Sequence, residues 1–442
     1  MSKPIQRIAA AFLLAFLLLA LALGRWSLIA ADLTARDDNP RRVFTEQLIQ
    51  RGSIVDRNDL VLAETVPQSG TLLRRYPFMA AAPVVGYASI NYGATGVEEA
   101  LDRVLRGPQE FLDQLLHHRQ NGQSARLTID SNAQRLLADR LTQPGAAVVL
   151  SIPDGAVLAL ASSPSFDPNT LDENWKALST DPAAPLLNRA TQGLYQPGAI
   201  FQSVLLAAAI ERGVLLTETL AQPDRPLTLD RLTLRCVPSA QGVHTLADAY
   251  AAACPAPFAD LAVQLGSTEL LSLTQKWKLD QPPSLEIRTS AVPTLTFDLS
   301  TTQALQAFGA GQGELTVSPL RMALVAATLG NNGFMPNAFV VKDVQTPEGQ
   351  WQPYLNNAAA PPAPIIDAAT ARALLAALRV QGNTLGQGGA AFSGDREHAW
   401  FIGLAPADQP KYAIAVLLED PQNAIDAENV GRGVLVDLIG AP

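Results

Sequence analysis

An uncharged apolar segment close to the amino terminus constrains this chain more than any other feature. The run from Ile8 to Gly24 contains no charged residue, and it is preceded by Lys3 and Arg7 and followed by Arg25 and Trp26. A helix of about 17–25 apolar residues is enough to cross a bilayer, and flanking arginine and tryptophan side chains extend it to the interface. We therefore expect a membrane anchor, and the positive charges before it favour a cytoplasmic amino terminus.

The same segment has a second interpretation, as a secretory signal peptide that is cleaved at Ala30-Ala31. The apolar run is longer than the core of an ordinary signal peptide, which favours the uncleaved anchor. Under either interpretation, the rest of the chain lies outside the cytoplasm. The two cysteines, Cys236 and Cys254, agree with export, because an even number in an exported chain suggests one disulfide. Two unpaired buried thiols are the alternative.

Composition excludes some classes of partner and bounds the number of domains. The formal net charge is -9, and no dense basic patch is visible, which argues against a nucleic-acid partner. A hydrophobic fraction of 48% and a charged fraction of 17% are typical of a folded protein with a large core. A chain of 442 residues is long enough for two or three domains. We expect no cofactor and no metal.

The pattern along the chain divides it into three parts. Residues 1–25 form the anchor with a short cytoplasmic amino terminus, and residues 26–124 lack a long periodic element and are expected to form a small, irregular membrane-proximal module. Residues 125–442 are expected to form one α+β domain, with strands at both ends and helices between them. The expected hairpins pair 146–152 with 156–161 and 399–404 with 412–418. The expected helices are 201–212, 246–265, 320–329 and 368–380, and 356–364 is expected to be a loop.

Several motifs along the chain carry a resemblance that covers nearly all of it. They are Arg51-Gly52-Ser53-Ile54-Val55-Asp56-Arg57, 145–160 with 162–169, Leu187-Asn188-Arg189-Ala190, Tyr195-Gln196-Pro197-Gly198, Gly311-Gln312-Gly313, 318–323, Asn331-Asn332-Gly333 and 398–406. Together they resemble the motifs of class B penicillin-binding proteins. The resemblance implies a pedestal or dimerisation-like module beside the membrane. It also implies a transpeptidase-like domain in which an antiparallel sheet packs between helices.

The resemblance also implies a chemistry, which is acyl transfer on peptidoglycan stem peptides. In that family a serine attacks the penultimate D-alanine carbonyl, and a lysine three residues later, on the same helical face, takes its proton. A Ser-x-Asn motif on a facing loop relays protons. A Lys-Thr-Gly strand binds the substrate carboxylate and helps to build the oxyanion hole.

All three motifs are altered in this chain. The first aligns with Ala199-Ile200-Phe201-Gln202, so alanine replaces the nucleophile and glutamine replaces the base. The second aligns with Ala253-Cys254-Pro255, and both of its polar members are absent. The third aligns with Phe392-Ser393-Gly394, which keeps a hydroxyl and the glycine but lacks the cation. We therefore expect no intact catalytic residue.

No complete set of the three family motifs occurs elsewhere in the sequence. None of the lysines follows a serine by three residues or precedes Thr-Gly or Ser-Gly; they are Lys3, Lys176, Lys276, Lys278, Lys342 and Lys411. Ser89-Ile90-Asn91 fits Ser-x-Asn but falls in the membrane-proximal module, where we interpret it as chance. Ser203 lies one turn beyond Ala199 without an evident base. Cys254 is a nucleophile by type, although a structural disulfide with Cys236 is the favoured interpretation, and a family strand position accounts for His398.

The resulting functional expectation is a catalytically inactive scaffold or regulator of a peptidoglycan-synthesis complex. We expect a single-pass protein of the cell membrane with its bulk outside the cytoplasm. The resemblance implies a partner, a SEDS-family peptidoglycan glycosyltransferase or another cell-wall synthesis protein, and predicts an apolar patch or groove on residues 25 to 125. Two alternatives stay open. One is an active D,D-transpeptidase with a relocated nucleophile, and the other is a noncovalent sensor of muropeptides, which would bind a stem peptide in the old cleft.

Overall fold

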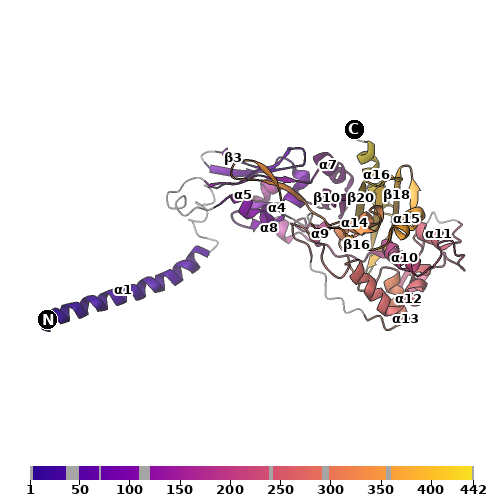
Figure 1. Cartoon of the computed structure of the whole chain (residues 1–442), viewed down its shortest axis with the longest axis horizontal. Helices are drawn as coiled ribbons and strands as arrows, with labels where there is room; N and C mark the ends of the chain where they lie inside the picture. Colours follow the sequence, from indigo (N-terminus) through magenta and orange to yellow (C-terminus); the bar gives the residue numbers. More distant parts are fainter. Residues whose placement is uncertain are drawn as a thin grey trace.

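The computed structural model describes residues 3–35, 49–68, 71–108, 120–237, 242–290, 298–354 and 360–440 (Figure 1). The expected loop 356–364 lies partly outside these residues. At the amino terminus, helix α1 (Lys3–Ala35) contains the 24-residue stretch Lys3–Trp26, in which an 18-residue window has a mean hydropathy of 2.4 and no part buried in the protein. At 1.5 Å per residue this stretch is about 36 Å long, which exceeds a hydrocarbon core of about 30 Å. The helix therefore fits a single-pass membrane protein.

A six-stranded antiparallel sheet forms the centre of the larger domain, in the order β10-β9-β20-β19-β18-β17. Its strands are β9 (Gly145–Ser151), β10 (Val157–Ser163), β17 (Arg379–Gln381), β18 (Thr384–Ser393), β19 (Arg396–Ala405) and β20 (Tyr412–Glu419). The two predicted hairpins are confirmed as β9–β10 and β19–β20. Because β20 also pairs with β9, strands from opposite ends of the domain meet in the middle of the sheet.

Both faces of this sheet are buried, and alternate side chains along β9, β19 and β20 point into the two different cores. Phe401 belongs to a core with α7 (Ser131–Arg140) and α16 (Asp426–Gly440), whereas its neighbours Trp400 and Ile402 belong to the core on the other face. That second face is covered by α14 (Pro319–Gly330) and by η3 (Gly198–Phe201), which continues into α10 (Gln202–Glu211). The period of two is what a strand buried on both faces requires. The predicted α+β fold, an antiparallel sheet packed between helices, is therefore confirmed.

A group of helices packs against α10 at the side of the domain away from β3 and α5 (Figure 1). It contains α11 (Leu246–Ala251), α12 (Pro255–Lys276), α13 (Thr302–Gly309) and α15 (Ala368–Ala377), with the small hairpin β11 (Leu227–Leu229) and β12 (Leu232–Leu234) beside it. The prediction of one helix over 246–265 was wrong. The chain breaks there because Ala253 has a φ of 50°, and Pro255, which has no N–H, begins a new helix.

The amino-terminal module after α1, which the sequence predicts to lie near the membrane, contains a second six-stranded sheet, in the order β15-β14-β8-β2-β3-β4. Its strands are β2 (Ile54–Val55), β3 (Val61–Gln68), β4 (Thr71–Arg75), β8 (Ala125–Leu127), β14 (Val341–Gln345) and β15 (Trp351–Pro353). The sheet thus takes strands from both sides of the expected division at residue 124. This joins the module to the larger domain through backbone hydrogen bonds.

Short elements complete the described chain. In the module they are β1 (Ile49–Gln50), η1 (Met79–Ala81), α3 (Ala82–Val85), β5 (Ala88–Ser89), β6 (Gly93–Ala94), α4 (Gly96–Ala100), α5 (Asp102–Arg106) and β7 (Gln120–Asn121). In the domain they are η2 (Pro168–Thr170), α8 (Leu171–Thr180), α9 (Arg189–Gln192), β13 (Phe334–Met335) and β16 (Ala363–Pro364).

A buried carboxylate, Glu98 of α4, holds the module together. Its side chain is fully buried and accepts from Arg51 Nη2 at 2.8 Å and from Arg74 Nε at 2.6 Å. Arg51 also pairs with Asp102 at 2.6 Å, and Arg74 Nη1 donates to the Gly52 carbonyl at 2.9 Å. One carboxylate therefore ties the segment before β2 to the edge strand β4 and to α4.

Glu98→Ala is expected to lower the free energy of unfolding by about 3–5 kcal/mol, because it leaves the nearly buried Arg74 without a carboxylate and Arg51 with only the partly exposed Asp102. The matched control is Glu99→Ala, which removes an ion pair to the largely exposed Arg288 and is expected to cost about 1 kcal/mol or less. Chemical denaturation of the full-length protein in detergent measures both values. Equal losses from the two variants would contradict this account of the module.

Candidate active site

The residues at the expected nucleophile and base positions lie where a short 3-10 turn becomes a helix. Ala199 belongs to η3 and Gln202 begins α10, and their exposures are 8% and 0%. Gly198 has a φ of 54°, and a Cβ at this position would clash with the carbonyl of Ala390 in β18. The N–H of Gly198 donates to the Gly311 carbonyl at 2.9 Å. The backbone of η3 therefore lies directly on β18.

Ala199 contributes only a methyl group to this contact. A Cβ built on Gly389 of β18 would lie 2.5 Å from the Cβ of Ala199, so strand and turn approach closely here. A methyl group has no oxygen or sulfur with which to attack a carbonyl. The first residue of the expected catalytic pair is therefore chemically inert.

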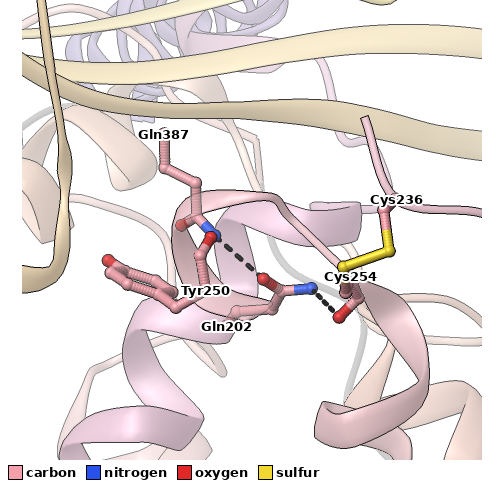
Figure 2. The surroundings of a disulfide bond; sticks show 5 residues. All are labelled: Gln202, Cys236, Tyr250, Cys254 and Gln387. Atoms are coloured by element: carbon pink, nitrogen blue, oxygen red, sulfur yellow. Dashed lines mark hydrogen bonds between the residues drawn. A yellow bond between two sulfur atoms is a disulfide. The ribbon is translucent and has the colours of Figure 1, made fainter. Parts of the chain in front are cut away.

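Gln202 is held in a neutral, fully buried hydrogen-bond network (Figure 2). Its Nε2 donates to the Cys254 carbonyl at 3.1 Å, and its Oε1 accepts from Gln387 Nε2 at 2.9 Å. The Nε2 of Gln387 also donates to the Tyr250 carbonyl at 3.1 Å. An amide does not take up a proton near neutral pH, so Gln202 positions the facing loop but provides no base.

Ser203, the candidate replacement nucleophile, belongs to the same network. It is 0% exposed, its Oγ lies 2.7 Å from the Tyr250 hydroxyl, and it donates to Gln387 Oε1 at 3.3 Å. Burial raises the pKa of Tyr250, which keeps its phenol neutral. Ser203 therefore contacts no group that is basic at neutral pH, and no surface of it reaches solvent.

The residues that align with the second motif lie beside Gln202. Ala253 and Cys254 form the break between α11 and α12, and the Cys254 carbonyl is the acceptor for Gln202. Cys254 is joined to Cys236 in a disulfide, so the predicted bridge is confirmed and Cys254 has no free thiol (Figure 2). Pro255 begins α12 without a side-chain donor.

The third motif is not brought beside Ala199 as a unit. Phe392 lines the cleft described below, but Ser393 and Gly394 lie at the exposed end of the β18–β19 hairpin. Gln387 and Gly389 of β18 instead contact Gln202 and Ala199. Neither residue was predicted from the sequence. The sequence did carry a signal for them, which is the glycine-rich run in this strand. Glycine in the interior of a strand marks the close approach of another backbone segment.

A small cleft of about 230 Å³ lies over these residues. It is bounded mostly by small or apolar side chains: Ala199, Leu234, Val237, Ala253, Pro255, Ala310, Gly389, Ala390, Phe392 and Ala424. Gln202, Thr233, Cys236 and two charged residues, Arg235 and Glu397, complete the described lining. This described lining contains no serine, lysine or histidine.

The remaining candidates lie outside the cleft. Ser89 and Asn91 close the β5–β6 turn of the module, where the Asn91 N–H donates to Ser89 Oγ at 3.1 Å. His398 is buried against the Tyr195 ring, and burial lowers its pKa, which favours the neutral imidazole. Among the described residues, no group of three His, Cys, Asp or Glu side chains is placed to hold a metal ion.

Gln387→Met is expected to destabilise the full-length protein by about 2–4 kcal/mol, because it leaves the Gln202 and Tyr250 oxygens buried without their donor. Gln381→Met, an exposed position on β17, is the control and is expected to change stability by less than about 0.5 kcal/mol. Chemical denaturation in detergent compares the two. A Gln387→Met protein as stable as the control would show that the network does not hold the site.

Comparison with known proteins places this geometry in a family. Residues 145–435 match the penicillin binding protein transpeptidase domain, and residues 51–125 match the penicillin binding protein A dimerisation domain. The peptidoglycan D,D-transpeptidase PbpA of Mycolicibacterium smegmatis is 31% identical over 97% of this chain and 96% of its own length. The PbpA of Mycobacterium tuberculosis is 30% identical over 98% of each chain.

Solved structures agree with the sequence matches. A penicillin-binding protein A from M. tuberculosis, solved as an imipenem acyl-enzyme complex, superposes with a TM-score of 0.79 at 28% identity. The match covers 89% of this chain and 99% of that one. The chain therefore belongs to the penicillin-binding protein transpeptidase family, in the class B group that includes PbpA.

Proposed function

We propose that this protein is a catalytically inactive member of its family, which acts as a scaffold or regulator in peptidoglycan synthesis. The observation that carries the proposal is the pair Ala199 and Gln202 at the start of the helix that should bear the nucleophile and the base. The methyl group of Ala199 is inert, and the amide of Gln202 is already bonded to Cys254 and Gln387.

The expected loss of catalytic rate is large enough to abolish useful acyl transfer. Removing the nucleophile or the base of a serine hydrolase costs on the order of a million-fold in rate. Here the second motif has lost both polar members as well. We also infer that Gln387-Gly388-Gly389, rather than Phe392-Ser393-Gly394, takes the place of the Lys-Thr-Gly strand, because it lies against Ala199 and Gln202. This revised assignment removes the same cation.

A relocated nucleophile is the competing proposal, and the structure offers little to support it. Ser203 is buried, and Cys254 is in a disulfide. Thr233 is the one hydroxyl-bearing residue in the described cleft lining, where no lysine or histidine accompanies it. Noncovalent sensing of a muropeptide remains the second candidate, and the open cleft over Ala199 favours it.

A partner site on the membrane-proximal module is supported by a second hollow. It measures about 590 Å³ and lies between β4, the β5–β6 hairpin and α8. Leu72, Leu73 and Ile90 line it together with arginine and acidic side chains, so it is less apolar than the sequence predicted. We propose that this hollow contacts a SEDS-family glycosyltransferase. Most of its lining residues belong to the module that follows the anchor in the sequence.

Location and domain division complete the proposal. We propose that α1 remains uncleaved in the cell membrane and that the bulk of the chain is extracytoplasmic. We retain residues 1–25 as the anchor, 26–124 as the module and 125–442 as the transpeptidase-like domain, with the second sheet shared across the last division.

Full-length protein incubated with a fluorescent penicillin is expected to carry no label after denaturing electrophoresis, because the described lining of the cleft contains no nucleophile with a base beside it. The PbpA of M. smegmatis, in parallel, serves as the labelled control. A label that survives denaturation would contradict the proposal. Its loss in Ser203→Ala or in Thr233→Val would then identify the residue that had been overlooked.

Co-purification with a SEDS-family glycosyltransferase from the same membrane tests the partner. Leu73→Glu places a charge in the hollow, at a leucine that is 48% exposed, and is expected to reduce recovery of the partner severalfold. Leu215→Glu, at a leucine that is 68% exposed and outside the hollow, is the matched control and is expected to leave recovery unchanged. Equal recovery with both variants, or no recovery with the unaltered protein, would contradict this site.

A further inference from the structure

Two opposite charges line the cleft over Ala199 without a partner. Arg235 follows β12, and Glu397 lies near the start of β19. Neither side chain makes a hydrogen bond or an ion pair with any residue in the part of the chain that the structure describes. Every other residue in the described lining is uncharged. The cleft therefore offers one free cationic and one free anionic group within a mostly apolar surround.

The surroundings of Glu397 make its lack of a partner significant. The side chain is partly buried, and this burial raises the pKa of the carboxyl group. Removing a carboxylate from water without a compensating partner costs free energy. A ligand cation would supply that partner, and the exposed guanidinium of Arg235 in the lining of the same cleft is suited to a carboxylate.

The size of the cleft limits the ligand. Its volume of about 230 Å³ is below the range of about 300–1,000 Å³ that is typical of sites for drug-sized ligands. The two charged side chains form no direct ion pair, so a ligand that meets both must span the gap between them. A dipeptide in extended form spans up to roughly 7 Å between its charged ends, so it can meet two groups that do not touch each other.

We propose that the cleft binds a small zwitterion, a dipeptide or an amino acid with free ends, with its ammonium at Glu397 and its carboxylate at Arg235. Binding is noncovalent, and in this respect the inference rests on the proposed absence of a nucleophile at Ala199. The apolar residues of the lining, including Ala390 and Phe392, contact the uncharged part of the ligand. A ligand with a single charge would leave the other protein charge without a partner.

Calorimetric titration of full-length protein in detergent with alanyl-alanine, in its L,L and D,D forms, tests this site. The tighter form is then compared with its N-acetyl and carboxamide derivatives, which each remove one charge. Each derivative is expected to bind about tenfold more weakly or worse, because each loses a charge-assisted hydrogen bond. These comparisons use unaltered protein and do not depend on any variant folding.

Variants then assign each charge to its residue. In Glu397→Gln, N-acetylation of the ligand is expected to change affinity less than twofold, and in Arg235→Gln the same holds for the carboxamide. Glu314→Gln and Arg396→Gln, at exposed positions outside the cleft, are the controls. Both are expected to bind the N-acetyl and the carboxamide derivatives as weakly, relative to the free dipeptide, as the unaltered protein does.

Three results would overturn the zwitterion site. The first is no saturable binding of either dipeptide up to about 10 mM. The second is an affinity for the N-acetyl and carboxamide derivatives equal to that for the free dipeptide. The third is that both derivatives still bind more weakly than the free dipeptide in the Glu397→Gln and Arg235→Gln variants. Recovery of the dipeptide after titration separates this failure from that of the proposed function. A cleaved dipeptide contradicts the absence of catalysis, whereas an intact one that binds without regard to its charges overturns only the assignment to Arg235 and Glu397.

Discussion

The close contact between the η3 turn and strand β18 is the constraint on which the rest of the site depends. Gly198, Gly311 and Gly389 let three backbone segments approach where a Cβ at any of these positions would clash. This contact fixes the start of α10 against the sheet and thereby places position 199 and position 202 opposite the α11–α12 break. It needs no catalytic side chain, which explains how the architecture of a transpeptidase persists around an alanine.

The polar groups behind that contact form a network that suits structure rather than chemistry. Gln202, Gln387, Ser203 and Tyr250 satisfy one another and two backbone carbonyls within hydrogen-bond distance. A buried network of neutral groups avoids the desolvation penalty that two buried lysines would incur. The same replacement removes the positive charge that would draw a peptide carboxylate to β18, and it leaves Arg235 as the cation of the described cleft lining.

Local patterns in the sequence predicted much of the fold, because turn residues and runs of apolar residues mark hairpins and helices without reference to distant parts of the chain. The turn at Pro153-Asp154-Gly155 between two apolar runs correctly predicted β9–β10, and the apolar run after Lys3 predicted α1. The break between α11 and α12 was missed, because the left-handed φ of Ala253 depends on tertiary packing. Gln387 was missed for a related reason. Its partner Gln202 is 185 positions away, and only the packing of η3 and the start of α10 against β18 brings the two together.

The central claim is that this cleft performs no acyl transfer, and the most direct test is release of D-alanine from a stem pentapeptide by the full-length protein. The account predicts no release above that of the buffer, with the PbpA of M. smegmatis as the comparison protein. Saturable release by the unaltered protein, unaffected by Ala199→Gly but abolished by a substitution at Ser203 or Thr233, would contradict it. That result would establish an enzyme with a relocated nucleophile.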